Sequence, residues 1–178
     1  MADRRPIKKA HERFHVKNFL EWFNRVYRSD FRVIEEPEPP EAIIQSSRTI
    51  RWVEISTAFW NDSFARDEFS YATPGEKHQS IGPGPFINMD REFASNFVTV
   101  LRKKLEKKSY LPVMEKYGPG YLIIPIRNPF FNEETIRWMK NEWANASVSD
   151  LGYFRSVRIC FRSMNNYVYY RWPRKGTK

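Results

Sequence analysis

Two short apolar segments, residues 41–45 and 50–55, each carry one glutamate and constrain the fold of this 178-residue chain more than any other feature. Both are rich in β-branched and aromatic residues, and the polar residues 46–49 separate them, which is the pattern of a β-hairpin. A four-residue loop at 46–49, or a two-residue loop at its centre, places Glu41 opposite Glu54, and we favour the longer loop because it holds no Gly or Asn. A loop of three or five residues shifts the register by one and separates the two glutamates.

In the favoured register, two carboxylates face each other across neighbouring strands. Alternation along the second strand puts Glu54 on the same face as Ile50 and Trp52, among residues expected to face the core. Like charges about 5 Å apart on paired strands are destabilising, so they require solvent, a proton or a cation. The functional interpretation is a site for a divalent metal ion.

Composition indicates one domain with a basic surface. The 41% hydrophobic content is enough for a sizeable core, and 30 Lys and Arg against 21 Asp and Glu give a net charge of +9. That charge favours nucleic acid as a partner, although a basic domain without such a ligand is the alternative. The single cysteine, Cys160, excludes an internal disulfide framework and a Cys-based metal site, and we interpret it as a core thiol in a cytoplasmic protein.

No sequence signal for membranes or secretion is present. No apolar run approaches the roughly 20 residues of a membrane span, and the charged start lacks an apolar stretch behind it. We therefore expect no membrane partner.

The order of predicted elements favours an α/β fold. Apolar residues at three- and four-residue spacing predict helices over 11–28, 91–109 and 132–144, with Asp90 capping the second. The predicted strands cover 31–34, 41–45, 50–55, 121–126, 156–161 and 167–172. The continuous apolar run at 121–126 is typical of a strand buried on both faces. We predict a central mixed sheet of about five or six strands flanked by helices.

The remaining segments divide the chain further. Residues 1–10 are expected to form a basic arm that contacts phosphates or a solvated terminus, 11–172 a single domain, and 173–178 a basic tail. Residues 57–90 are predicted to be an insertion beside the glutamate pair, with a short helix near 62–69, acting as a substrate-binding flap.

Several common chemistries have no pattern here. The Gly82-Pro83-Gly84-Pro85 stretch lacks the strand, Lys and Ser or Thr of a phosphate-binding loop. The three histidines, His11, His15 and His78, have no zinc-ligand spacing, and no serine-triad signature is found.

The order helix, three strands, helix, strand over residues 11–126 resembles the PD-(D/E)XK, or restriction-endonuclease-like, nuclease superfamily. Pro40-Glu41 opens the second strand and Glu54-Ile55-Ser56 lies in the third, as the two acids of that motif do. The resemblance implies that both acids bind Mg²⁺ (or Mn²⁺) and that a lysine assists attack of water on a phosphodiester bond. Ser56 stands where that lysine is expected, which is a departure from the motif.

The resemblance also implies where a replacement lysine lies. Some members supply it from the following helix, where Lys103 and Lys107 share one side and Lys104 and Lys108 another. Glu12 resembles the acid that many members place on their first helix, and its other interpretation is a first-turn residue that complements the helix dipole. The dipole also explains the lysines without a catalytic role.

The resemblance and the basic charge together define the expected site. Its catalytic residues are Glu41, Glu54, Lys104 and Lys108, and its metal ligands are Glu41, Glu54 and Glu12. The residues expected to contact nucleic acid are Arg4, Arg5, Lys8, Lys9, Arg48, Lys103 and Lys107. The implied activity is metal-dependent hydrolysis of nucleic acid, DNA before RNA, with a homodimer left open. A catalytically inactive module that binds nucleic acid or protein on the same scaffold is the alternative.

Overall fold

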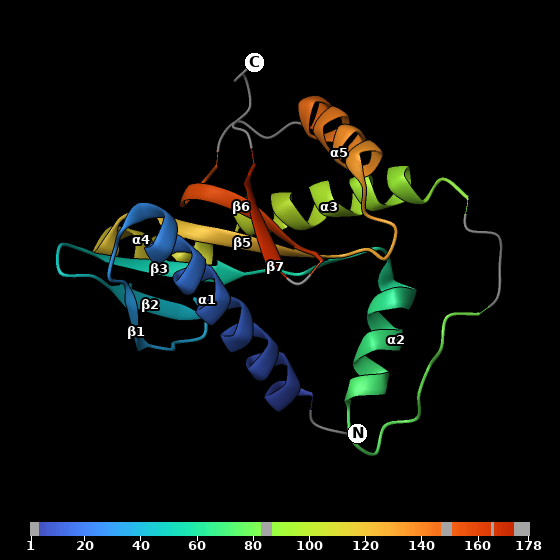
Figure 1. The fold of residues 1–178 in the computed structure, drawn as a ribbon, viewed down its shortest axis with the longest axis horizontal. Helices are drawn as coiled ribbons and strands as arrows, with labels where there is room; N and C mark the ends of the chain where they lie inside the picture. The colour runs from blue at the N-terminus through green and yellow to red at the C-terminus, as the bar shows by residue number, and fades with distance from the viewer. Residues whose placement is uncertain (1–3, 83–86, 147–150, 165, 173–178) are drawn as a thin grey trace.

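The computed structural model describes residues 4–82, 87–146, 151–164 and 166–172 of the chain. Within those residues, a seven-stranded mixed sheet carries helices on both faces, so the predicted α/β class is confirmed (Figure 1). The helices are α1 (Arg5–Tyr27), α2 (Asp62–Ala72), α3 (Met89–Leu105), the short 3₁₀ helix η1 (Lys108–Tyr110), α4 (Leu111–Tyr117) and α5 (Glu133–Asn145). The strands are β1 (Arg32–Glu35), β2 (Ala42–Gln45), β3 (Ile50–Ile55), β4 (Ala58–Phe59), β5 (Gly120–Arg127), β6 (Phe154–Ser163) and β7 (Asn166–Arg171).

Three parallel strands form the middle of the sheet. The strand order is β1-β2-β3-β5-β6-β7, with β4 paired to the far end of β5. Strand β5 runs parallel to β3 and β6, and its residues from Gly120 to Ile126 are buried, as the apolar run predicted. The carboxyl ends of β3, β5 and β6 therefore meet at one edge of the sheet.

The hairpin of β2 and β3 has the favoured register. Gln45 pairs with Ile50 and Ala42 with Val53, so the loop has four residues and the register is as predicted. The Ser46 hydroxyl oxygen accepts hydrogen bonds from the backbone N–H groups of Arg48 and Thr49, which closes the loop without Gly or Asn. Continuing this register by one residue places Glu41 opposite Glu54.

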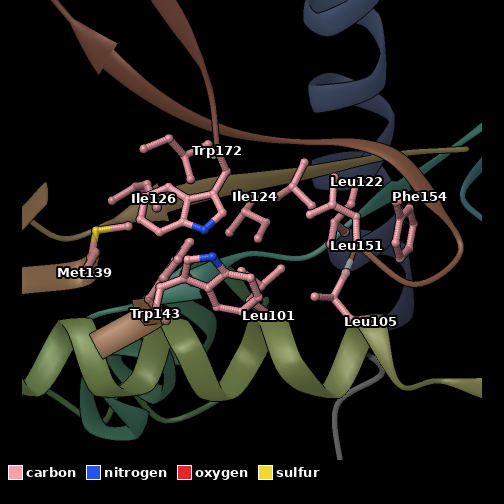
Figure 2. Close-up of a cluster of buried hydrophobic side chains, with 14 of the residues drawn as sticks. Leu101, Leu105, Leu122, Ile124, Ile126, Met139, Trp143, Leu151, Phe154 and Trp172 are labelled. Atoms are coloured by element: carbon pink, nitrogen blue, oxygen red, sulfur yellow. The ribbon is translucent and has the colours of Figure 1, made fainter. Parts of the chain in front are cut away.

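Two apolar layers hold the helices on the sheet. On one face, Phe19 and Phe23 of α1 pack against the sheet. On the other face, α3 and α5 cover a larger cluster that includes Leu101, Leu122 and Trp143, which Figure 2 shows between α3 and the strands. Glu54 belongs to the α3 face, because it alternates with the buried Trp52 along β3.

Helix α1 begins earlier than predicted. It starts at Arg5 rather than near residue 11, with Pro6 in the first turn, where a missing N–H has no cost. Residues 5–10 are therefore helical and do not form the expected arm. Glu12 lies about two turns into the helix, so its interpretation as a first-turn dipole partner is wrong.

Helix α3 differs from its prediction at both ends. Its N-cap is Asn88, whereas Asp90 lies in the first turn and accepts a hydrogen bond from the Thr135 hydroxyl of α5. The helix ends at Leu105 rather than at residue 109, and the chain then turns so that Tyr110 is fully buried against the ring of Trp52. Burial of that large aromatic side chain outweighs the continued helical pattern of the lysines.

The segment predicted as an insertion contains regular structure. Helix α2 begins at Asp62 as expected, where the Asn61 side chain caps it by accepting from the Phe64 N–H, and it continues to Ala72 rather than ending near residue 69. It lies beyond the end of the sheet, away from α3 and α5 (Figure 1). The basic tail predicted at 173–178 lies outside the described residues.

Two further expectations concern Cys160 and membranes. Cys160 is a buried free thiol, and burial raises its pKa to about 12, so the core interpretation is confirmed. Within the described ranges, no helix combines the length and the apolar character needed to cross a bilayer.

Candidate functional site

Glu54 is a buried carboxylate with one side chain of opposite charge beside it. It lies next to the end of β3 and is 1% exposed. Its Oε1 accepts hydrogen bonds from Lys104 Nζ at 2.5 Å and from Tyr110 Oη at 2.6 Å. Its Oε2 is buried, and among the described residues the remaining group that shares a hydrogen bond with Glu54 is the Glu41 carboxyl when it carries a proton. Without that proton or a cation, Glu54 would hold an unpaired polar atom in a place where one is costly.

Glu41 faces this carboxylate from the start of β2. Its Oε2 accepts a hydrogen bond of 3.0 Å from the backbone N–H of Ile55, the residue after Glu54. Burial, and then the neighbouring Glu54 carboxylate, raise the pKa of Glu41 to about 9. In the absence of a cation, Glu41 therefore holds a proton at neutral pH, which is one of the three ways for such a pair to be tolerated.

Of the four lysines proposed from the sequence, Lys104 is the one that contacts a candidate acid. It lies in the last turn of α3, and its side chain is 23% exposed, whereas Lys103, Lys107 and Lys108 are exposed. Lys108 was expected on the same side as Lys104, but the helix ends before it. Lys107 instead lies over the Tyr110 ring, 5.1 Å from its centroid.

Glu12 lies nearby but is engaged with a lysine. Its side chain is 12% exposed and pairs with Lys8 at 3.3 Å, and Lys8 also binds Glu38 at 2.9 Å. Burial raises the pKa of Glu12, and the Lys8 charge opposes that rise. Across the part of the chain that the structure describes, no three His, Cys, Asp or Glu side chains are grouped to hold a metal ion. The predicted set of three carboxylate ligands is therefore not assembled.

A cavity of about 210 Å³ adjoins these groups, although Glu54 itself is not in its wall. Glu12, Glu41, Ser56 and Lys104 line it, together with His11 and the rings of Phe59 and Phe69. The His11 ring forms a 3.0 Å hydrogen bond with the Thr57 hydroxyl. Burial and the charge of Arg127 lower the pKa of His11, so its imidazole is neutral at pH 7. Positive charge at this cavity comes from Lys8 and Lys104.

The basic residues expected to contact nucleic acid are not all near this cavity. Arg5, Lys9, Lys103 and Lys107 are exposed, and Arg4 pairs with Glu76 of the α2–α3 connection. Lys8 lines the cavity. Arg48 lies in the β2–β3 loop, six residues before Glu54 along β3, which is about 20 Å in an extended strand. The structure therefore separates Arg48 from the carboxylates.

Sequence reasoning missed Tyr110 and His11. Tyr110 follows a run of lysines, and nothing in its spacing distinguishes a tyrosine that binds a carboxylate from an ordinary core aromatic. His11 lines the same cavity as its neighbour Glu12 in α1. The sequence prediction began this helix at residue 11 rather than at Arg5, and it did not place His11 at the site.

Comparisons with known proteins add little to this geometry. No protein-family model matches the chain, and no curated protein matches it. A solved structure of SfsA from Pyrococcus furiosus in complex with Ca²⁺ aligns with 99% of this chain at 13% identity and a TM-score of 0.33. This chain spans 65% of that protein's length. A similarity that weak carries no argument about function.

Proposed function

We propose that this protein is a metal-dependent nuclease of the PD-(D/E)XK type, which hydrolyses phosphodiester bonds in nucleic acid, DNA before RNA. The observation that carries the proposal is the contact between Lys104 and Glu54, with Glu41 opposite across the hairpin. Glu41 and Lys104 line one cavity, and Glu54 lies buried behind them in contact with Lys104, so the two acids and the lysine of the superfamily motif are grouped together. Lys104 supplies from α3 the charge that Ser56 cannot supply.

The residues at the site fit a hard divalent cation such as Mg²⁺ or Mn²⁺. Glu41 and Glu54 face each other in a buried place, and burial and the Glu54 carboxylate raise the pKa of Glu41, a rise that a bound cation would oppose. Mg²⁺ prefers oxygen ligands, keeps several waters and takes one or two carboxylates, so Glu41 and Glu54 would be enough to hold it. Bound there, the ion would lower the pKa of a water and neutralise charge on the phosphate.

Lys104 and Tyr110 would orient groups at the site and stabilise negative charge there. Lys104 keeps a fixed positive charge at the cavity, where it would orient a water and stabilise negative charge that develops on the phosphate. Tyr110 donates to Glu54 Oε1 and thereby fixes the carboxylate's orientation, so it is a positioning residue. Burial and the Glu54 charge raise the pKa of Tyr110, so its hydroxyl remains a donor at every physiological pH.

A cleavage assay tests the proposal. Plasmid DNA, single-stranded DNA and RNA are each incubated with Mg²⁺, with Mn²⁺ or with chelator. We expect cleavage that requires metal, and a loss of about 100-fold or more in Glu54→Gln and in Lys104→Met. The control is Lys17→Met, an exposed lysine of α1 outside the cavity wall, which should keep activity within about twofold.

Two outcomes would contradict the proposal. Cleavage that survives Glu54→Gln would place the chemistry elsewhere in the protein. A protein that never cleaves, but binds nucleic acid with an affinity that falls steeply with salt, would be the inactive binding module instead. Thermal stabilisation by millimolar Mg²⁺ provides a readout independent of activity, because it grows with the logarithm of ion concentration over Kd.

A further inference from the structure

A second and larger cavity, of about 690 Å³, lies at the carboxyl ends of β5 and β6. The residues of its wall that bear on its chemistry are Phe64, Arg127, Asn128, Phe131, Phe161 and Arg162. Its volume is within the range of roughly 300–1,000 Å³ that is typical of small-molecule sites. Neither the carboxylate pair nor Lys104 lines it, so it is a separate site.

The wall combines aromatic faces with an unpaired amide donor. The rings of Phe131 and Phe161 lie 4.9 Å apart, and Phe64 of α2 contributes a third ring. Asn128 is 9% exposed, and its Oδ1 accepts from the Phe130 N–H, but its Nδ2 is buried without a hydrogen-bond partner. A flat ligand with a ring nitrogen or carbonyl would stack on such rings and provide the acceptor that this amide lacks.

Charge at this cavity favours a neutral ligand over a phosphate. Arg127 is paired with Glu68 through two hydrogen bonds of 3.0 and 2.7 Å, and Glu133 lies in the wall with Arg162, so the formal charges cancel. At the α5 N-terminus, the Asn132 side chain accepts from the N–H groups of Glu134 and Thr135, so these two donors are not free for an anion. The wall therefore favours an uncharged, planar ring that forms hydrogen bonds over a charged phosphate.

The two cavities are neighbours along the sheet edge. The first contains residues that follow β3, and the second contains the ends of the parallel strands β5 and β6. Helix α2 separates them, with Phe69 lining the first and Phe64 and Glu68 lining the second. Arg127 of the second wall pairs in register with Phe59 of the first, where β4 lies along β5. One strand of nucleic acid could therefore reach both.

We propose that the second cavity binds an unpaired nucleobase, so that the substrate is nucleic acid with a single-stranded or extruded nucleotide beside the cleaved phosphate. The identification of the ligand as nucleic acid rests on the proposed function. Extrusion is least costly where a base is already unpaired, so the cavity selects strands that lack base pairing.

Binding without metal tests this inference separately from catalysis. Fluorescence anisotropy in chelator compares a labelled single strand of about 12 nucleotides, a length suited to single-strand sites, with the same sequence as a duplex. Ser163→Trp fills the cavity from its exposed rim, and Phe131→Ala removes a stacking ring. Both should weaken single-strand binding by about tenfold, while duplex binding changes by no more than about twofold. Phe130→Ala is the matched control, since that exposed ring is outside the wall.

The outcomes separate the two proposals. Phe131 packs against Phe93 and Phe161, so Phe131→Ala also removes core contacts, and thermal unfolding is measured for each variant. Ser163→Trp removes no core contact. No single-strand preference in the wild type, or equal losses for single strand and duplex, would overturn the cavity proposal even if the protein cleaves. Selective losses in a protein that never cleaves would support the cavity and refute the nuclease.

Discussion

Replacing Glu41 with glutamine should stabilise the metal-free protein. Burial and Glu54 raise the pKa of Glu41 from its ordinary value of 4.5 to about 9, so the folded state holds a proton that the unfolded chain releases. The amide of glutamine is neutral and of similar shape, can still accept from the Ile55 N–H, and offers an N–H donor to the Glu54 carboxylate in place of the proton that Glu41 carries. The substitution therefore removes a cost of folding.

The size of that cost follows from the pH. Below pH 4.5, Glu41 is protonated in both states and contributes no difference. As the pH rises towards 9, only the folded state keeps the proton, so the free energy of unfolding falls by about 1.4 kcal/mol per pH unit. At pH 7 the accumulated cost is about 3 kcal/mol. We expect Glu41→Gln to gain about that amount at pH 7 and to reduce the loss of stability as the pH rises.

Urea unfolding in chelator between about pH 5 and about pH 8 measures this difference directly. Glu21→Gln is the matched control, because that side chain is 63% exposed, and it should change the free energy of unfolding by about 0.5 kcal/mol at most. Millimolar Mg²⁺ should stabilise the wild type and not Glu41→Gln. A variant that is less stable than the wild type at pH 8, with the same slope against pH, would refute the reasoning.

Two further predictions concern the support of the site. Tyr110→Phe should lower the free energy of unfolding by about 2 kcal/mol, since a buried hydrogen bond to a charged group is lost. An unchanged urea midpoint would mean that Lys104 alone stabilises Glu54. Gly120→Ala should cost at least about 2 kcal/mol, because the added Cβ would lie 2.3 Å from the Trp52 ring. Gly82→Ala, where the Cβ meets nothing within 4 Å, should leave the melting temperature unchanged, and equal effects at the two positions would refute the clash.

Helix ends were the least predictable part of the fold. The start of α1 was placed near residue 11 because the apolar spacing begins there, yet the helix begins at Arg5, with Pro6 in its first turn. Conversely, the lysine-rich pattern predicted a helix to residue 109, but burial of Tyr110 ended it at Leu105. In both cases a tertiary contact or a terminal residue outweighed the local periodicity.

The sequence by itself determined the class of fold and the pairing of Glu41 with Glu54. Loop length and strand alternation are local properties, so a four-residue loop between two apolar strands was enough to set the register. It did not determine which lysine serves the site, because Lys104 and Lys108 share one side of the predicted helix and spacing alone does not separate them. Only the tertiary structure identified Lys104 and Tyr110 as the partners of Glu54. They lie 50 and 56 residues from it along the chain, and they reach it because α3 packs on the sheet and ends at Leu105.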